Sequence, residues 1–203
     1  MIKNIIFDMG NVLIYFDRDY FLDAAGVTDP KDRQLLMREV YLSLEWSRMD
    51  RGSLTENEAT EIFLSRVPER LHEKVKTLVG EWDRPILPVP GMADLIGELK
   101  TNGYGIYLLS NASLRQHEYW PRVPGCELFD GALVSADVKL VKPQTEIYAL
   151  LCDKFSIKPE ESIFVDDSTP NVEAAFFFGM NGVVFHNDVD ELRNKLRDFG
   201  VEI

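Results

Sequence analysis

The sequence predicts an α/β fold, a doubly wound parallel sheet with a helical segment inserted after the first strand. Three observations indicate this class. The strand-like segments are apolar throughout, which is typical of parallel strands whose two faces are both covered. Helical stretches alternate with these segments along the second half of the chain, as in βαβ units. Residues 17–84 are instead charged and helical in period.

The first predicted strand is residues 4–8, Asn-Ile-Ile-Phe-Asp, which ends on an acidic residue. The helical segment follows it. Within that segment the run GSLTENEATEIF, residues 52–63, begins with two Ser/Thr-x-x-Glu pairs that both fit the capping box of a helix start. The stretch LPVPG, residues 87–91, then interrupts the helical pattern before another helix begins.

Four more strands are predicted after this interruption, at residues 105–109, 131–135, 162–167 and 182–186. Helices are expected between them, over the runs TEIYALLCDKF and TPNVEAAFFFG. The simplest division is a core of residues 1–16 and 85–203 with a helical insertion of residues 17–84. Doubly wound sheets bind ligands beyond the carboxyl ends of their strands, so we expect the functional site at that edge.

The composition argues against several classes of function. The chain has 22 basic and 34 acidic residues, a net charge of −12, whereas a nucleic-acid or anionic-membrane surface needs a positive footprint. No apolar run approaches the ~18–20 residues of a membrane span, and no targeting segment precedes the first strand. The two cysteines form no disulfide framework. These features predict a cytoplasmic protein and leave a phosphorylated small molecule as a partner.

Polar side chains gather at four of the predicted strand ends: Asp8; Ser110 and Asn111; Lys142; Asp166 and Asp167. Three carboxylates in one crevice repel one another unless a hard cation joins them, and oxygen ligands of this kind suit Mg²⁺. Serine, asparagine and lysine side chains beside that cation would hold the oxygens of a phosphate. Each residue alone could cap a helix or start a turn, but that interpretation leaves the order of the four groups unexplained.

The four groups lie in the motifs FDMGNV, LLSNAS, KPQTEIY and FVDDSTPNVEAA, in this order. Together they resemble the motifs of the haloacid dehalogenase-like hydrolase superfamily along essentially the whole chain. The resemblance implies a Rossmann-like core and identifies the helical insertion as similar to a C1-type cap domain. The form FDxGNV is similar to the branch that contains sugar-1-phosphate phosphatases, which implies a sugar phosphate such as a hexose 1-phosphate as substrate.

The resemblance implies that Asp8 is a nucleophile that attacks phosphorus to give an aspartyl-phosphate. Ser110, with the backbone of Asn111, would bind the transferring phosphoryl oxygens. Lys142 would neutralise the charge shared between Asp8 and the phosphoryl group. Phosphate contacts are also implied for the residues that follow the nucleophile, Gly10 and Asn11.

The resemblance also implies a Mg²⁺ site. Asp8, Asp166 and Asp167 would supply carboxylate oxygens, and Gly10 would supply its backbone carbonyl. Asn171, one turn into the following helix, would orient a ligand from outside the coordination sphere. Opposite charge from Mg²⁺ and Lys142 would favour the ionised form of the carboxyl groups.

Gly10 departs from the pattern of the family. Phosphatases of this superfamily usually carry there a second Asp, which protonates the leaving oxygen and then activates water. General acid–base assistance is typically worth ~10²–10⁴-fold in rate, so its absence matters most for a poor leaving group. A sharp turn that favours glycine is a second explanation, compatible with the first.

Three functions remain open on the sequence. The leading hypothesis is a Mg²⁺-dependent phosphatase whose proton comes from water, the substrate or another residue. The second is a catalytically weak protein that binds a phosphometabolite or a partner. The third is a 2-haloacid dehalogenase, which uses the Asp nucleophile without metal and resembles SSN where this chain has DDS at residues 166–168.

Substrate selection is expected to come from the helical insertion. The run LEWSRMDRG places Glu45, Trp46 and Arg48 near one helix end. C1-type caps supply substrate-selecting residues from this kind of segment, and Arg48 could contact a phosphate or a sugar hydroxyl. The alternative is that Trp46 packs inside the cap and Arg48 is solvated. The sequence does not indicate the oligomeric state.

Overall fold

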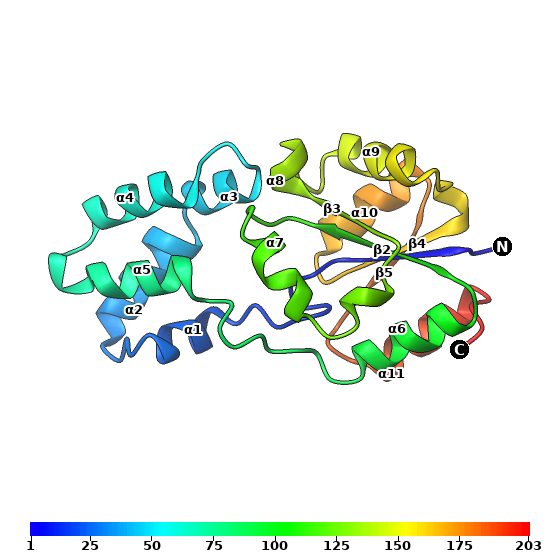
Figure 1. The fold of residues 1–203 in the computed structure, drawn as a ribbon, viewed down its shortest axis with the longest axis horizontal. Helices are drawn as coiled ribbons and strands as arrows, with labels where there is room; N and C mark the ends of the chain where they lie inside the picture. Colours follow the sequence, from blue (N-terminus) through cyan, green and yellow to red (C-terminus); the bar gives the residue numbers. More distant parts are fainter.

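The computed structural model describes all 203 residues. Its centre is a single five-stranded sheet in the order β3-β2-β1-β4-β5, with every neighbouring pair parallel (Figure 1). The strands are β1 (Asn4–Phe7), β2 (Gly105–Ser110), β3 (Gly131–Val134), β4 (Ser162–Asp166) and β5 (Asn181–Val184). The chain builds outward from β1 on one side and then crosses to β4 on the other. The predicted α/β parallel sheet is confirmed, with strand ends within two residues of the expected ones.

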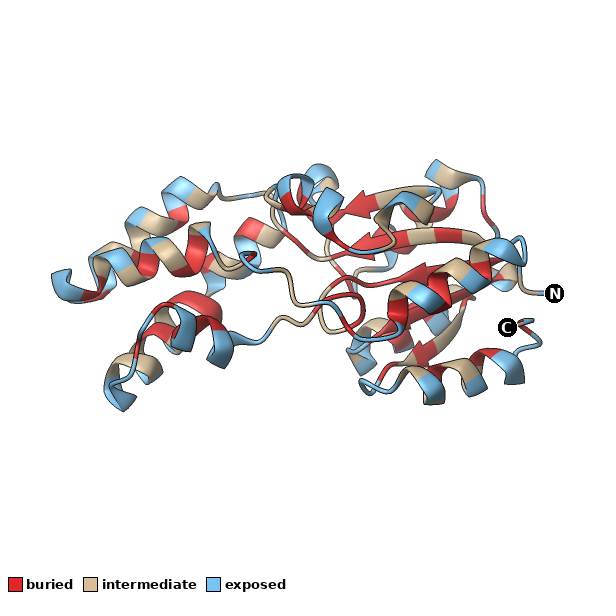
Figure 2. Cartoon of the chain, turned by 60° about the horizontal axis from the view of Figure 1, so that its bottom comes forward, coloured by how far each residue is buried: buried red, intermediate tan, exposed pale blue.

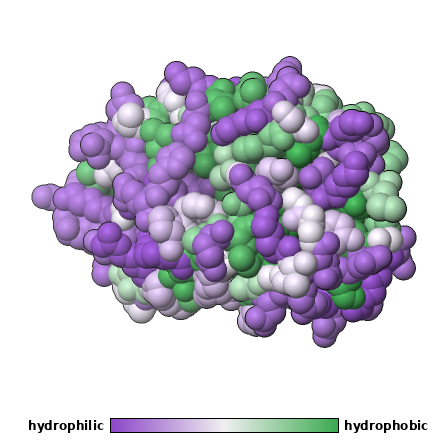
Figure 3. All heavy atoms as spheres, turned by 45° about the vertical axis from the view of Figure 1, so that its right-hand side comes forward, coloured by the Kyte–Doolittle hydropathy of each residue, from purple (hydrophilic) through white to green (hydrophobic).

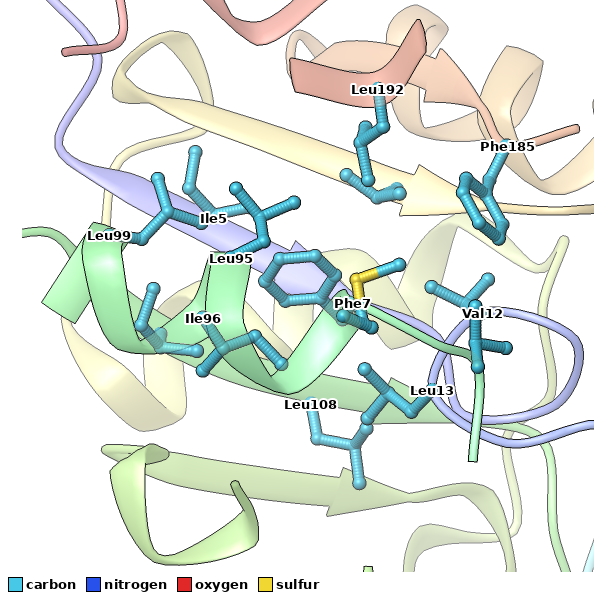
Figure 4. Close-up of a cluster of buried hydrophobic side chains, with 14 of the residues drawn as sticks. Ile5, Phe7, Val12, Leu13, Leu95, Ile96, Leu99, Leu108, Phe185 and Leu192 are labelled. Atoms are coloured by element: carbon cyan, nitrogen blue, oxygen red, sulfur yellow. The ribbon is translucent and has the colours of Figure 1, made fainter. Parts of the chain in front are cut away.

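Helices cover both faces of the sheet, which explains why its strands are apolar throughout. On one face α6 (Met92–Thr101) and α11 (Val189–Asp198) pack on alternate residues of β1, Ile5 and Phe7. Figure 4 shows Leu95, Ile96 and Leu99 of α6 turned toward this strand. On the other face α9 (Thr145–Phe155) and α10 (Thr169–Phe178) pack on Ile6.

The segment between β1 and α6 folds into a helical body with its own hydrophobic cluster. It contains α1 (Arg18–Ala24), α2 (Pro30–Leu36), a π-helical turn at Met37–Tyr41, α3 (Leu44–Asp50), α4 (Glu56–Arg66), a 3₁₀ turn at Glu69–Leu71 and α5 (His72–Gly80). In Figure 2 the buried faces of these helices turn toward one another, away from the sheet. The amphipathic helices therefore bury their apolar faces mainly among themselves.

Only one of the two predicted capping boxes forms. The Thr55 hydroxyl accepts a hydrogen bond from the Glu58 backbone N–H at 3.2 Å, and the Glu58 carboxylate accepts one from the Thr55 N–H at 2.9 Å. The Ser53 hydroxyl instead donates to the Arg48 carbonyl at 3.2 Å, because Glu56 is the first residue of α4 and cannot reach back to Ser53 as a third-position partner.

Short elements complete the chain between β2 and β4: α7 (Gln116–Tyr119), α8 (Ser135–Val138) and 3₁₀ turns at Trp120–Arg122, Cys126–Leu128 and Pro159–Glu161. No helix of the chain has the length and apolar character needed to cross a membrane. Hydrophilic residues cover much of the face in Figure 3, with hydrophobic atoms scattered between them.

The end of α3 is docked against the core through α8. Gly52 has φ +70°, and a Cβ atom there would overlap the Ala136 carbonyl group. The buried Ser135 hydroxyl donates to the Asp50 carbonyl and accepts from the Ala112 N–H at 2.9 Å. The helical body is thus joined to the loop that follows β2, where the functional site was expected.

Gly52→Ala tests this docking. We expect a loss of stability from the left-handed backbone, about 1–2 kcal/mol, plus a further ~1–3 kcal/mol from the close approach to Ala136. Gly103→Ala is the matched control, since Gly103 has φ +85° and a Cβ atom there would have no neighbour within 4 Å. Urea denaturation measures both variants. Equal losses would contradict a docking contact at Gly52.

Candidate active site

The carboxyl ends of β1, β2 and β4 bring the sequence-predicted side chains together. Asp8 directly follows β1, and its N–H continues the ladder to the Val165 carbonyl of β4 at 2.9 Å. Ser110 is the last residue of β2, and Asp166 is the last residue of β4. All three are at most 9% exposed. The sheet therefore delivers one polar residue from each of three neighbouring strands to the same edge.

Lys142 lies at the centre of this group. Its Nζ is 2.7 Å from Asp8 Oδ1 and 2.7 Å from Asp166 Oδ2, and it donates to the Leu109 carbonyl at 2.9 Å. The side chain is fully buried. The Asn111 side chain fixes the Lys142 backbone with two hydrogen bonds, of 2.8 and 3.0 Å. The lysine is therefore held rigidly beside the predicted nucleophile.

The electrostatics of the site favour an additional cation. Burial raises the pKa of Asp8 to about 7, Lys142 opposes the rise, and the Asp166 charge adds to it. Burial alone would lower the pKa of Lys142, but the two carboxylates raise it above its usual value. One lysine thus faces two carboxylates in a buried place, and Asp167 adds a third acidic group nearby.

The acidic groups are arranged as a metal site would require. Oxygens of Asp8, Asp166 and Asp167 all lie within 4.8 Å of one another. Both Asp166 oxygens are already occupied, by Lys142, by the Ser168 N–H at 2.8 Å and by the Asn171 amide at 3.1 Å. Hard carboxylate oxygens in this grouping fit Mg²⁺, with Asp8 and Asp167 the more open ligands.

Backbone N–H groups near Asp8 are available for an anion. Those of Gly10 and Asn111 donate no hydrogen bond within the chain. Asn11 differs: its N–H donates to the Ile14 carbonyl at 2.6 Å, and its side-chain amide donates to Asp167 at 3.0 Å. Asn11 therefore supports Asp167 through its side chain, and it lines the cavity beside Asp8 together with Gly10, Ser110 and Asn111.

The backbone does not explain the glycine at position 10. The left-handed residue of this turn is Asn11, with φ 55°, and Gly10 has no positive φ. A Cβ at Gly10 would meet only the Cβ of Phe16, at 3.8 Å, an ordinary contact. The expectation that a sharp turn favours glycine here is therefore wrong, and a Cβ atom fits at this position.

A cavity of about 320 Å³ lies between the strand ends and the helical body. Its far wall is aromatic, with Phe16 at the centre. The Phe16 ring centroid lies 5.0 Å from that of Trp82, 5.8 Å from Trp46 and 6.0 Å from Tyr41. Tyr119 extends the wall, 5.1 Å from Trp82. The cavity thus has charged groups at the strand ends and an aromatic cluster on the side of the helical body, where Arg18, Asp50 and Glu56 also line it.

Of the three insertion residues predicted to select substrate, only Trp46 lines this cavity. Glu45 is buried in an ion pair with Arg66, whose two nitrogens lie 2.8 Å from its oxygens. Arg48 borders an adjoining depression, which shares Ser47 and Asn111 with the cavity. Trp46 also packs within the insertion, as the alternative expected, because the centroids of its ring and the Tyr41 ring are 5.0 Å apart.

Several cavity residues were not predicted from the sequence: Phe16, Arg18, Tyr41, Asp50, Trp82 and Tyr119. They come from the linkers and from distant helices, so no local motif marks them. The sequence offers one signal, and it concerns Asp50. This acidic residue ends a helix directly before Arg51 and Gly52, and a glycine at this place is typical of a helix end.

Comparison with known proteins gives a family for this arrangement. Residues 2–179 match the family model described as haloacid dehalogenase-like hydrolase. The sesquiterpene phosphatase astK of Aspergillus oryzae is 28% identical over 188 residues, which cover 89% of this chain and 88% of that protein. Drimenol cyclase drtB of Aspergillus calidoustus is 28% identical over 97% of this chain, which spans only 36% of that protein.

A solved structure has the same fold. The HAD-family enzyme of Bacteroides thetaiotaomicron, in complex with magnesium and inorganic phosphate, superimposes with a TM-score of 0.72 at 21% identity. The alignment covers 95% of this chain and 99% of that one.

Proposed function

This chain belongs to the haloacid dehalogenase-like hydrolase family, and from this premise we propose that it is a Mg²⁺-dependent phosphatase of a small phosphorylated metabolite. The observation that carries the proposal is the position of Asp8. It stands at a strand end, 2.7 Å from a buried lysine, with two further carboxylates within 4.8 Å. A carboxylate supported in this way is suited to attack an electron-poor centre that carries negative oxygens.

In the proposed reaction Asp8 attacks phosphorus and the ester bond to the leaving alcohol breaks, which gives an aspartyl-phosphate. Water then attacks phosphorus, releases inorganic phosphate and restores the carboxylate. Lys142 stabilises the charge that the Asp8 oxygen shares with the phosphoryl group. Ser110 and the free N–H groups of Gly10 and Asn111 are positioned to bind the other phosphoryl oxygens.

Asp8 and Asp167 would hold the Mg²⁺ ion with the Gly10 carbonyl, and Asp166 would lie beside them as the partner of Lys142. The bound ion would neutralise phosphoryl charge as a Lewis acid. Asn171 and Ser168 keep Asp166 in place, and Asn11 keeps Asp167 in place.

Metal removal is expected to stop the reaction, and Asp167→Asn to raise the Mg²⁺ concentration for half-maximal activity by at least ~10-fold. Asp153→Asn is the control, because Asp153 is exposed on α9 and forms no ion pair. Phosphate release is measured against Mg²⁺ concentration after treatment with a chelator. Full activity in the presence of chelator would contradict the proposed metal site.

Two substrate classes fit the proposal, and they make different demands on the cavity. A sugar phosphate such as a hexose 1-phosphate needs polar partners for its hydroxyl groups, which Arg18, Ser47 and Ser113 could supply. An apolar alcohol needs the aromatic wall around Phe16. The wall and the relative named as a sesquiterpene phosphatase favour the apolar alcohol.

A substrate panel tests the function and separates its alternatives. It contains p-nitrophenyl phosphate, hexose 1- and 6-phosphates, a sesquiterpenoid alcohol phosphate and 2-haloacids, each with and without Mg²⁺. We expect Mg²⁺-dependent phosphate release, fastest from the apolar phosphate. Halide release without metal would identify a dehalogenase. Metal-dependent thermal stabilisation by a phosphate ester without turnover would identify a binding protein.

A further inference from the structure

The cleft contains a carboxyl group that the proposed reaction has not used. Asp50 is the last residue of α3 and belongs to the helical body, and it lines the same cavity as Asp8. Its side chain forms no ion pair and no hydrogen bond to another side chain. The other insertion carboxylate of the cavity, Glu56, is instead bound to Arg115 at 2.6 Å.

Asp50 is fixed relative to the core, although it belongs to the helical body. Its carbonyl accepts the Ser135 hydroxyl, which also accepts from the Ala112 N–H of the loop after β2. Two residues later the backbone of Gly52 lies against Ala136. These contacts fix the Asp50 backbone against the core, and its side chain lines the same cavity as Asp8.

We propose that Asp50 is the general acid and base of this enzyme and performs the role of the carboxyl group that is absent at Gly10. The proposal rests on the proposed phosphatase function. In the first step Asp8 bonds to phosphorus, the bond from phosphorus to the leaving oxygen breaks, and that oxygen takes the Asp50 proton. In the second step water bonds to phosphorus and gives a proton to Asp50, while the Asp8–phosphorus bond breaks.

The surroundings of Asp50 support a protonated carboxyl at neutral pH. Burial raises the pKa of Asp50 to about 8, the Asp8 charge adds to the rise, and Arg18 and the Ser113 backbone oppose it. Tyr119 is a further titratable neighbour, and its pKa is raised chiefly by burial and then by Asp50. Glu56 and Asp167 line the same cavity. Arg48, Arg51 and Lys142 border an adjoining depression together with Asp50. A carboxylic acid in this environment can donate its proton to an alkoxide leaving group.

The test compares a leaving group that needs no proton with one that does. Asp50→Asn keeps the shape of the side chain but cannot donate or accept the proton. With p-nitrophenyl phosphate we expect a retained burst of p-nitrophenolate, followed by slow turnover and accumulation of phosphoryl-Asp8. With an alkyl phosphate we expect kcat/KM to fall by ~10²–10⁴-fold. Asp50→Ser should behave in the same way.

Two further variants complete the design. Gly10→Asp in the Asp50→Asn background should restore turnover of the alkyl phosphate, since a Cβ atom at position 10 makes only an ordinary contact and Gly10 lines the cavity beside Asp8. Glu61→Gln, an exposed carboxylate on α4, should change neither substrate. Circular dichroism and thermal melting confirm that each variant is folded.

The outcomes separate this proposal from the function on which it rests. Equal losses for both leaving groups in the first step, no loss in Asp50→Asn, or no rescue by Gly10→Asp would overturn the role of Asp50 while phosphatase activity stands. A folded wild-type protein that releases phosphate from no ester would overturn the proposed function and this role together.

Discussion

Asp8→Asn is expected to lower kcat by on the order of 10⁴–10⁶-fold, the range measured when a catalytic nucleophile or its partner is removed. The amide has nearly the shape of the carboxylate but cannot form the acyl phosphate. The protein should stay folded, because Lys142 keeps its contact with Asp166 at 2.7 Å. Initial rates of phosphate release at saturating substrate measure the effect.

Asp17→Asn is the matched control for this experiment. Asp17 is the N-cap of α1, its carboxylate accepts from the Tyr20 N–H at 3.0 Å, and it does not line the cavity. Asparagine caps helices as well as aspartate does, so activity and stability should be unchanged. An Asp8→Asn protein that keeps a tenth or so of its activity would remove the covalent step from the proposed mechanism, since transition-state stabilisation alone leaves far less.

Lys142→Met is expected to lower the free energy of unfolding by about 3–5 kcal/mol, because it leaves two buried carboxylates without their counter-charge. In a chain of this length such a loss lowers Tm by roughly 6–20 °C. Lys76→Met is the control: Lys76 pairs with Glu73 at 2.7 Å on an exposed helix surface, and such pairs contribute ~0–1 kcal/mol. Thermal and urea denaturation without metal measure both variants.

The pH dependence of this variant follows from the same charges. Burial already raises the pKa of Asp8 to about 7, and removal of Lys142 takes away the charge that opposes this rise. The folded state of the variant therefore binds more protons than the unfolded chain near neutral pH. Stability of the variant should therefore increase as the pH falls from 7 toward 5. Lys142→Met with Asp166→Asn should recover part of the loss, and no recovery would contradict an origin in uncompensated charge.

The sheet and the polar strand ends were predictable because each depends on local sequence. A buried parallel strand has to be apolar on both faces, as Ile5, Ile6 and Phe7 are, and its carboxyl end is where Asp8 must emerge. The position of Lys142 between Asp8 and Asp166 also follows from opposite charges at neighbouring strand ends. The sequence does not predict which of Asp166 and Asp167 pairs with Lys142 and which stays open to a metal ion. That difference depends on which carboxylate the lysine side chain reaches in the fold.

The cavity wall was not predictable, because its residues are brought together by packing between helices. Phe16 and Trp82 lie on the two linkers to the helical body and meet only when both linkers cross the strand ends. Asp50 shows the same limit. Its sequence neighbours resemble an ordinary helix end, and its position against the core depends on Ser135 and Ala136, some 85 residues away in the chain.

The central claim, that Asp8 carries the phosphoryl group, is tested most directly by trapping the covalent enzyme. Enzyme and p-nitrophenyl phosphate are mixed and quenched in acid within one turnover. The protein is then digested, and the masses of its peptides are measured by mass spectrometry. The Asp50→Asn variant is included because it should slow hydrolysis of the phosphoryl-Asp8 intermediate. The account predicts one phosphoryl group on the peptide that contains Asp8 and none on that peptide in Asp8→Asn. Release of p-nitrophenolate with an unmodified Asp8 peptide would contradict it.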